Sequence, residues 1–287
     1  MTLIQNAHAQ APIALAARVN QVFFQPQPTS THFTPLPAPL YGGNPALPEI
    51  ALTFDDGPHP GSTLKIVAIL KRFSVKATFF CVGQHVQSYP DYVRQEYANG
   101  NLVEDHTWTH PDLRLLSSAD VAQQLASTAN EIERVTGAMP TLFRPPYGIF
   151  NWSIFAQARR MALSSIIWNV DPKDWSMPGT NTIIWRVLSA AGNGSIVLMH
   201  DGGGDRSQTV AALPTIITTL RQRGFRFVTV EQMIRDLAQK TSGSHAITVP
   251  GSSTLLFTTQ APCLQSQALP MLKPNRQADV IQRNIRC

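Results

Sequence analysis

Short apolar runs alternate with longer segments of helical period along the middle of the chain. Ile50, Leu52 and Phe54 form the first apolar run, and residues 77–82 form a second. Further strand candidates lie at 101–105, 141–143, 166–170, 196–199 and 225–230. Apolar runs of this length that end at turn residues are typical of buried strands.

Helical periods separate these runs. Apolar residues recur at helical spacing over 64–73, 121–135 and 210–220. Ser117 and Asp120 have the spacing of a helix start, and Gly137 and Gly224 are placed to end helices. Strands that alternate with helices predict a parallel sheet with helices outside it. With about six or seven such units we expect an α/β fold, a closed or nearly closed (β/α) barrel whose chemistry gathers at the C-terminal ends of its strands.

The two ends of the chain differ from its middle. The first 48 residues hold eight of the 22 prolines, which predicts an irregular, proline-rich N-terminal arm over 1–48. Residues 241–287 are rich in Ser, Thr and Pro and show no period, so we expect an irregular C-terminal tail there. The domain is therefore expected to span 49–240. The sequence leaves open a disulfide between Cys263 and Cys287 in the tail. Cys81 lies in an apolar run and is expected to be a buried thiol.

Composition excludes some classes of partner. The net charge is +5, but Lys and Arg are scattered, so we expect a mildly basic surface and no nucleic-acid partner. No apolar stretch approaches the roughly 20 residues that span a membrane. Charged residues make up only 14% of the chain, which suits a secreted protein. We expect an extracellular or cell-envelope location, although no clear signal peptide is present, and a monomer.

Two clusters carry residues that bind metals. Asp55 and Asp56 follow the first strand, where one carboxylate is able to ligate a metal while the other faces a substrate; taken alone, the pair is an ordinary turn. His106 and His110 have the i, i+4 spacing that places two imidazoles on one face of a helical turn. One carboxylate and two imidazoles leave open coordination positions, as in catalytic metal sites.

Three further clusters follow later strands. Arg144 to Gly148 read Arg-Pro-Pro-Tyr-Gly, a stiff loop suited to aim a backbone N–H at a developing oxyanion, while Arg144 is able to clamp a carboxylate. Asp174 and Trp175 follow the 166–170 strand, where an aspartate is placed to orient a partner and an indole to line a pocket. His200 ends the 196–199 strand, a position that favours a general acid or base in a barrel.

Taken in chain order, these five clusters resemble the motifs of the polysaccharide deacetylase family, carbohydrate esterase family 4, with its NodB-homology domain. The sequence contains Thr-Phe-Asp-Asp-Gly, His-Thr-x-x-His, Arg-Pro-Pro-Tyr-Gly, Asp-x-x-Asp-Trp and Leu-x-His, and the resemblance covers residues 49–238. It implies a distorted (β/α) barrel of about seven strands, in agreement with the strand pattern.

The resemblance also implies roles at the matched positions. Asp56, His106 and His110 would hold a divalent metal, commonly zinc, with cobalt or manganese as alternatives. The implied catalytic residues are Asp55 as general base, Arg144 as its partner, Tyr147 through its backbone N–H, His200 as general acid and Asp174 as the residue that tunes it. The implied substrate-binding residues are Pro145, Pro146, Trp175 and Leu198. Glu104 and Asp105 depart from the family pattern, and this acidic pair predicts extra negative charge near the metal.

The activity implied is hydrolytic removal of N-acetyl groups from a polysaccharide that contains N-acetylglucosamine, either chitin oligomers or peptidoglycan, with release of acetate. The main alternative is an O-deacetylase that acts on acetylxylan. A non-catalytic carbohydrate-binding protein on the same scaffold is a second alternative. Two histidines and one carboxylate also suit Fe(II), so a non-haem iron oxygenase is a third, although that class usually uses a β-sandwich.

Overall fold

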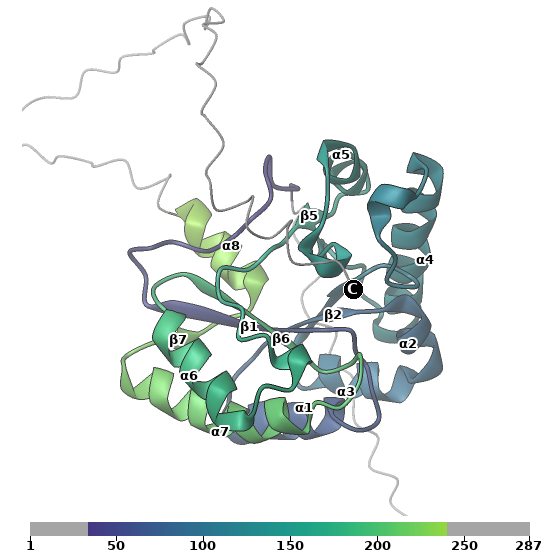
Figure 1. Ribbon diagram of the computed structural model, residues 1–287. Helices are drawn as coiled ribbons and strands as arrows, with labels where there is room; N and C mark the ends of the chain where they lie inside the picture. Colours follow the sequence, from purple (N-terminus) through teal and green to yellow (C-terminus); the bar gives the residue numbers. More distant parts are fainter. Residues whose placement is uncertain (1–33, 240–287) are drawn as a thin grey trace, which may run out of the picture. The chain divides into compact units, whose positions relative to one another are not determined.

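The computed structural model describes residues 34–239, which form one parallel sheet surrounded by helices (Figure 1). The strands are β1 (Glu49–Asp55), β2 (Thr78–Cys81), β3 (Leu102–Asp105), β4 (Leu142–Phe143), β5 (Ser164–Ser165), β6 (Ser195–His200) and β7 (Arg226–Phe227). Their order is β5-β4-β3-β2-β1-β6, with β7 paired to β1, and all pairs are parallel.

The sheet curls into a nearly closed barrel. Val170, downstream of β5, bridges Val197 in β6, so the two ends of the strand order meet. Leu40 bridges Ile166 and continues the sheet beside β5, where its N–H donates to Ser165 O at 2.9 Å. The seven-stranded distorted (β/α) barrel expected from the sequence is therefore confirmed.

Helices cover the outside of this barrel. They are α1 (Thr63–Arg72), α2 (Gly83–Ser88), α3 (Pro90–Ala98), α4 (Ser118–Thr136), α5 (Trp152–Arg160), α6 (Thr180–Ala190), α7 (Ser207–Gln222) and α8 (Val230–Gln239). Figure 1 shows α1, α3, α6 and α7 along one side of β1 and β6, and α2, α4 and α5 along another. Among the described residues, no helix is long and apolar enough to cross a membrane.

Strand β1 is buried along its whole length because both of its faces pack against apolar side chains. Ile50, Leu52 and Phe54 belong to one core cluster, whereas Ala51 belongs to another. Alternate residues of a strand point to opposite faces, and in a covered parallel sheet both faces are apolar. Cys81 is buried in the first of these clusters, as expected from the sequence.

Two predicted strands differ from the observed ones. The run at 166–170 makes only isolated bridges, and the regular pairing lies just before it in β5. The run at 225–230 pairs only over β7, because Val230 already begins α8. Residues 1–33 and 240–287, with Cys263 and Cys287, lie outside the described residues, so what the sequence predicts for the first 33 residues of the arm and for the tail stays a prediction.

Candidate active site

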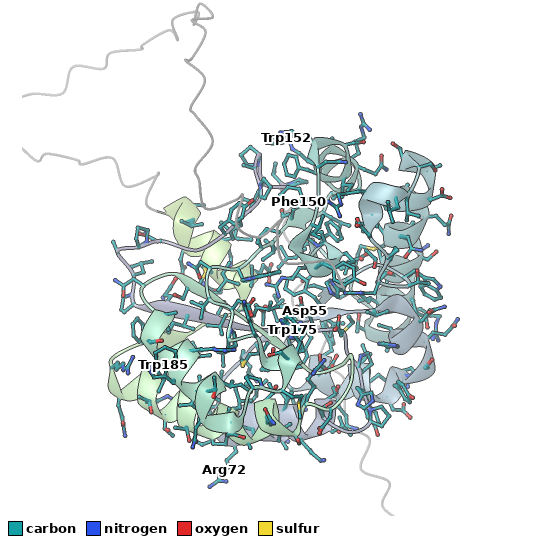
Figure 2. The ribbon with its side chains drawn as sticks, in the orientation of Figure 1. Asp55, Arg72, Phe150, Trp152, Trp175 and Trp185 are labelled. Atoms are coloured by element: carbon teal, nitrogen blue, oxygen red, sulfur yellow. The ribbon has the colours of Figure 1, made fainter. Side chains whose placement is uncertain are left out.

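The polar clusters meet at one end of the barrel. Asp55 ends β1 and pairs in register with His200, the last residue of β6. His106 and Arg144 directly follow β3 and β4, which lie on the other side of β1 in the same sheet. Since all strands run parallel, these residues gather at the carboxyl edge, where barrel chemistry takes place. Figure 2 labels Asp55 over the middle of the view.

Asp56, His106 and His110 form a candidate metal site. Their ligand atoms all lie within 4.8 Å of one another. Asp56 Oδ1 is 3.4 Å from His106 Nε2 and 3.3 Å from His110 Nε2. Ligands bound tetrahedrally to zinc at about 2.0–2.2 Å lie roughly 3.4 Å from each other, so these separations suit a shared cation.

The protonation pattern of these side chains also fits a metal. Asp56 Oδ1 is buried without a hydrogen-bond partner. His106 Nδ1 donates to Arg144 O at 2.7 Å, which leaves Nε2 unprotonated in the neutral ring and facing Asp56. Burial, together with the neighbouring His106, lowers the pKa of His110 to about 4, so its ring is neutral at ordinary pH. Burial opposes ionisation of Asp56, yet the nearby histidines hold its pKa below the usual value.

His106 and His110 do not share a helical turn, so the sequence-based reason for pairing them was wrong. Both lie in the loop after β3, and the chain turns back because Thr107 and His110 adopt positive φ angles of 70° and 58°. Gln124 Oε1 on α4 accepts the N–H groups of residues 108 and 109 at 2.9 Å each. The loop, held by this glutamine, brings the two rings to 4.9 Å between centroids.

Asp55 is held by a buried arginine. Arg144 is fully buried, and its Nη1 donates to Asp55 Oδ1 at 2.6 Å and to Thr53 Oγ1 at 2.8 Å. Its guanidinium stacks 4.1 Å from the centroid of the Phe80 ring. The second Asp55 oxygen, Oδ2, lies 3.8 Å from His106 Nε2, so this carboxylate borders the metal site. The geometry suits a fixed proton acceptor beside the candidate metal site.

His200 is paired with Asp174. His200 Nδ1 lies 2.7 Å from Asp174 Oδ1, and the His200 backbone N–H donates to Oδ2 at 2.9 Å. Thr209 Oγ1 of α7 donates to the same Oδ2 at 2.7 Å. Burial alone would lower the pKa of His200, but the hydrogen bond to Asp174 and its charge raise it to about 9. The imidazolium form is therefore favoured, as a general acid requires.

The residues expected to touch substrate differ in exposure. Tyr147, with φ 61°, is 61% exposed, and its ring packs 4.6 Å from the His110 ring. Trp175 is 52% exposed, so the side chains of Tyr147 and Trp175 are both partly open to solvent. Pro145 and Pro146 are buried, as is Leu198 in β6. Contact of these three with a bound acetyl group stays a prediction.

The acidic pair before His106, Glu104 and Asp105, is buried. Glu104 Oε2 accepts the backbone N–H groups of residues 141 and 142 at 2.9 and 2.8 Å, so its side chain is engaged at the start of β4. Burial raises the pKa of Glu104 to about 8 and also raises the pKa of Asp105. Burial therefore disfavours the charged form of both carboxyl groups.

Sequence reasoning missed four residues that support the site. The Nδ1–H of His85 donates to Asp56 O at 2.8 Å. Asp201 is fully buried, and its backbone N–H donates to Asp55 O at 3.0 Å. Burial raises the pKa of the Asp201 carboxyl group to about 7. Arg206 and Thr209 at the start of α7 were also missed. The only signal for Asp201 and Arg206 was their place in the glycine-rich loop after His200.

Comparisons with known proteins agree with this geometry. The family model for polysaccharide deacetylase matches residues 42–166. A peptidoglycan-N-acetylglucosamine deacetylase from Bacillus cereus is 39% identical over 188 residues, which cover 65% of this chain and 88% of that protein. A chitooligosaccharide deacetylase from Bradyrhizobium is 37% identical over 217 residues, 71% of this chain and 99% of the relative.

A solved structure shares the fold. The crystal structure of a CE4 family pseudoenzyme from Bacillus anthracis matches 69% of this chain and 69% of its own, with a TM-score of 0.66 and 32% identity. Identity above 30% to relatives that are matched over almost their whole length agrees with the five motifs and with the barrel. The chain belongs to the polysaccharide deacetylase family.

Proposed function

We propose that this protein is a metal-dependent hydrolase that removes N-acetyl groups from a polysaccharide containing N-acetylglucosamine and releases acetate. The observation that carries the proposal is the meeting of Asp56, His106 and His110 at the carboxyl edge of the barrel. The buried pair of Asp55 with Arg144 borders this site.

The donor set suits a divalent cation. One carboxylate and two imidazoles match the three protein ligands of catalytic zinc sites, and cobalt and manganese are alternatives. Such an ion, when bound, would lower the pKa of a coordinated water towards about 7 and polarise the acetyl carbonyl. Asp56, His106 and His110 would hold it through Oδ1, Nε2 and Nε2, the atoms that face one another.

The remaining residues handle protons and charge. Asp55, fixed by Arg144, accepts the proton of the attacking water through its Oδ2 side. The backbone N–H of Tyr147 is assigned to the oxyanion. An amide nitrogen leaves poorly unless it is protonated. Because His200 Nδ1 is committed to Asp174, the proton for the leaving nitrogen comes from His200 Nε2.

A side-by-side assay tests the proposal and its alternatives. Acetate release is measured from N-acetylglucosamine oligomers, peptidoglycan and acetylxylan under the same conditions, with added zinc. We expect release from the first or second substrate, which relatives of this chain are named for. Release from acetylxylan alone would identify an O-deacetylase. Absence of release from all three would contradict the proposal. Peptidoglycan and acetylxylan are cell-wall polymers, which supports the proposal of an extracellular or cell-envelope location.

One observation favours a non-catalytic protein, because a pseudoenzyme shares this fold. Against it, all proposed ligands and proton-transfer residues are present here and Asp55, His106 and Arg144 are buried in position. The iron oxygenase alternative loses its support, since the strands form a parallel barrel and the relatives are named deacetylases.

The pH dependence of the reaction is predicted from His200. Its pKa of about 9 lies above the ordinary 6.5, so the proton-donating form is present below pH 9 and lost above it. Turnover of the amide substrate should fall as the pH rises through about 9.

The pair with Asp174 likewise stabilises the fold fully below pH 6.5 and loses this contribution as the pH rises through about 9. In Asp174→Asn the alkaline limb of the kcat profile should move to lower pH. An unmoved limb would show that another group sets it.

A further inference from the structure

Asp56 holds a backbone conformation that a residue with a side chain adopts only under constraint. Its φ angle is 72°, in the left-handed region, where such residues persist only if their surroundings hold them. His85 Nδ1–H donates to Asp56 O at 2.8 Å. Gly202 packs against the same oxygen so closely that a Cβ at Gly202 would lie 2.0 Å from it. The position of Asp56 therefore depends on the loop that follows β6.

Gly203 extends this contact to the Asp56 carboxylate. A Cβ built at Gly203 would lie 2.5 Å from Asp56 Oδ2 and 3.2 Å from Arg206 Nη2, so this glycine lies between the carboxylate and the guanidinium. Gly203 has a φ of 72°, which favours glycine. The loop is able to lie against Asp56 only because residues 202 and 203 have no side chains.

Arg206 fixes the other side of this loop. Its side chain is buried, at 5% exposure, and its Nε and Nη2 donate to Gly202 O and Gly203 O, each at 2.7 Å. Nη1 reaches Trp175 O at 3.4 Å. Guanidinium donors form a rigid planar fork, so one side chain is able to hold several carbonyl groups in a fixed arrangement.

We propose that Arg206 is a positioning residue for Asp56, which sets metal affinity through the backbone of Gly202 and Gly203. This inference rests on the proposed function, because it takes the Asp56 site to bind a divalent cation. Within residues 34–239 no ion pair joins Arg206 to Asp56, whose close side-chain neighbours are the imidazoles of His106 and His110. The effect of Arg206 therefore passes through the loop. Substitution of a residue that orients a metal ligand without binding the metal itself typically lowers metal affinity 10- to 100-fold.

Zinc affinity tests the proposal directly. In Arg206→Ala, competition with a chromophoric chelator should show zinc affinity reduced about 10- to 100-fold. Arg206→Lys should show a smaller loss, since an ammonium lacks the planar fork that holds both carbonyls. Gly203→Ala should also weaken zinc binding, because the added Cβ would clash with Asp56 Oδ2 and displace the carboxylate.

Arg221→Ala is the matched control. Arg221 lies near the other end of α7, and its Nη2 donates to Phe73 O at 2.7 Å, so this variant also loses a bond from guanidinium to carbonyl. Its zinc affinity should equal that of the wild type. Circular dichroism and the Tm of the metal-free proteins report folding. If Arg206→Ala does not fold, the zinc affinities of Arg206→Lys and Gly203→Ala test the proposal in its place.

Wild-type zinc affinity in folded Arg206 variants, or an equal loss in Arg221→Ala, would overturn the role of Arg206. Because zinc binding is measured without acetate release, a wild-type protein that binds zinc but releases no acetate counts against the proposed function alone. The effect of Arg206 on affinity would stand in that case. A wild-type protein that binds no zinc would overturn both.

Discussion

The Asp56→Ala variant is expected to lose its bound zinc and at least about a thousandfold in the rate of acetate release. Asp56 Oδ1 is the only carboxylate oxygen among the described residues that lies within 3.4 Å of both His106 Nε2 and His110 Nε2. Its removal leaves two neutral imidazoles, which hold a divalent ion weakly. Loss of about 4 kcal/mol of transition-state stabilisation corresponds to roughly 10³ in rate. Zinc per protein by elemental analysis and acetate release measure the two effects.

Asp55→Asn provides the matched comparison, because the two carboxylates are neighbours in the chain. Asparagine keeps an oxygen for the Arg144 Nη1 bond, so this variant should retain zinc. It should still lose about 10²- to 10⁴-fold in turnover, since the amide does not accept the proton. Full zinc and full activity in Asp56→Ala would show that the ligand assignment is wrong. Zinc loss in Asp55→Asn would show that Asp55 is also needed for metal binding and is not only the proton acceptor.

Helix α4 was predictable because its signals are local. Ser117 accepts the N–H of Asp120 at 3.2 Å, and Gly137 ends the helix with a φ of 76°. Apolar residues in between recur on one face and are buried. Every one of these features lies within a single stretch of chain, so the sequence pattern contains all of them.

Strand β5 was misplaced because its pairing is not local. Ser164 and Ser165 show no apolar alternation, and they pair because β4 and the segment at Leu40 lie on either side. The apolar run that follows is buried in part by closure of the barrel, where Val170 meets Val197. The apolar pattern also predicted no helix at 83–98, where α2 is followed almost directly by α3, which begins at Pro90. Elements this short are defined by contacts with distant segments.

The site was largely predictable because a parallel barrel collects the ends of its strands. Placing Asp55, His106, Arg144 and His200 after separate strands was enough to bring them together. The supporting role of Arg206 was not predictable, because it arises only where the start of α7 folds back on the loop beside Asp56. Contacts of this kind depend on how two elements pack, and no spacing along the chain reports them.

His200→Ala should slow amide hydrolysis by about 10²- to 10⁴-fold while leaving zinc binding unchanged. His200 makes its side-chain bond to Asp174, and the proposed ligands lie in the segments that follow β1 and β3. The loss should depend on the leaving group. An acetyl amide needs a proton on its nitrogen, whereas an acetate ester of a nitrophenol releases a stable anion without one. The variant should therefore hydrolyse the activated ester much closer to the wild-type rate.

This dependence on the leaving group separates acid catalysis from a merely structural role. A structural role would slow both substrates equally, because a displaced metal or a distorted pocket affects attack on either carbonyl. Asp174 keeps its bonds from Thr209 Oγ1 and from the backbone N–H of residue 200 in the variant, so its buried carboxylate is not left without donors. Equal losses on the amide and the ester, or loss of zinc, would contradict His200 as the acid. A loss confined to the amide would assign to His200 Nε2 the proton that the leaving nitrogen receives.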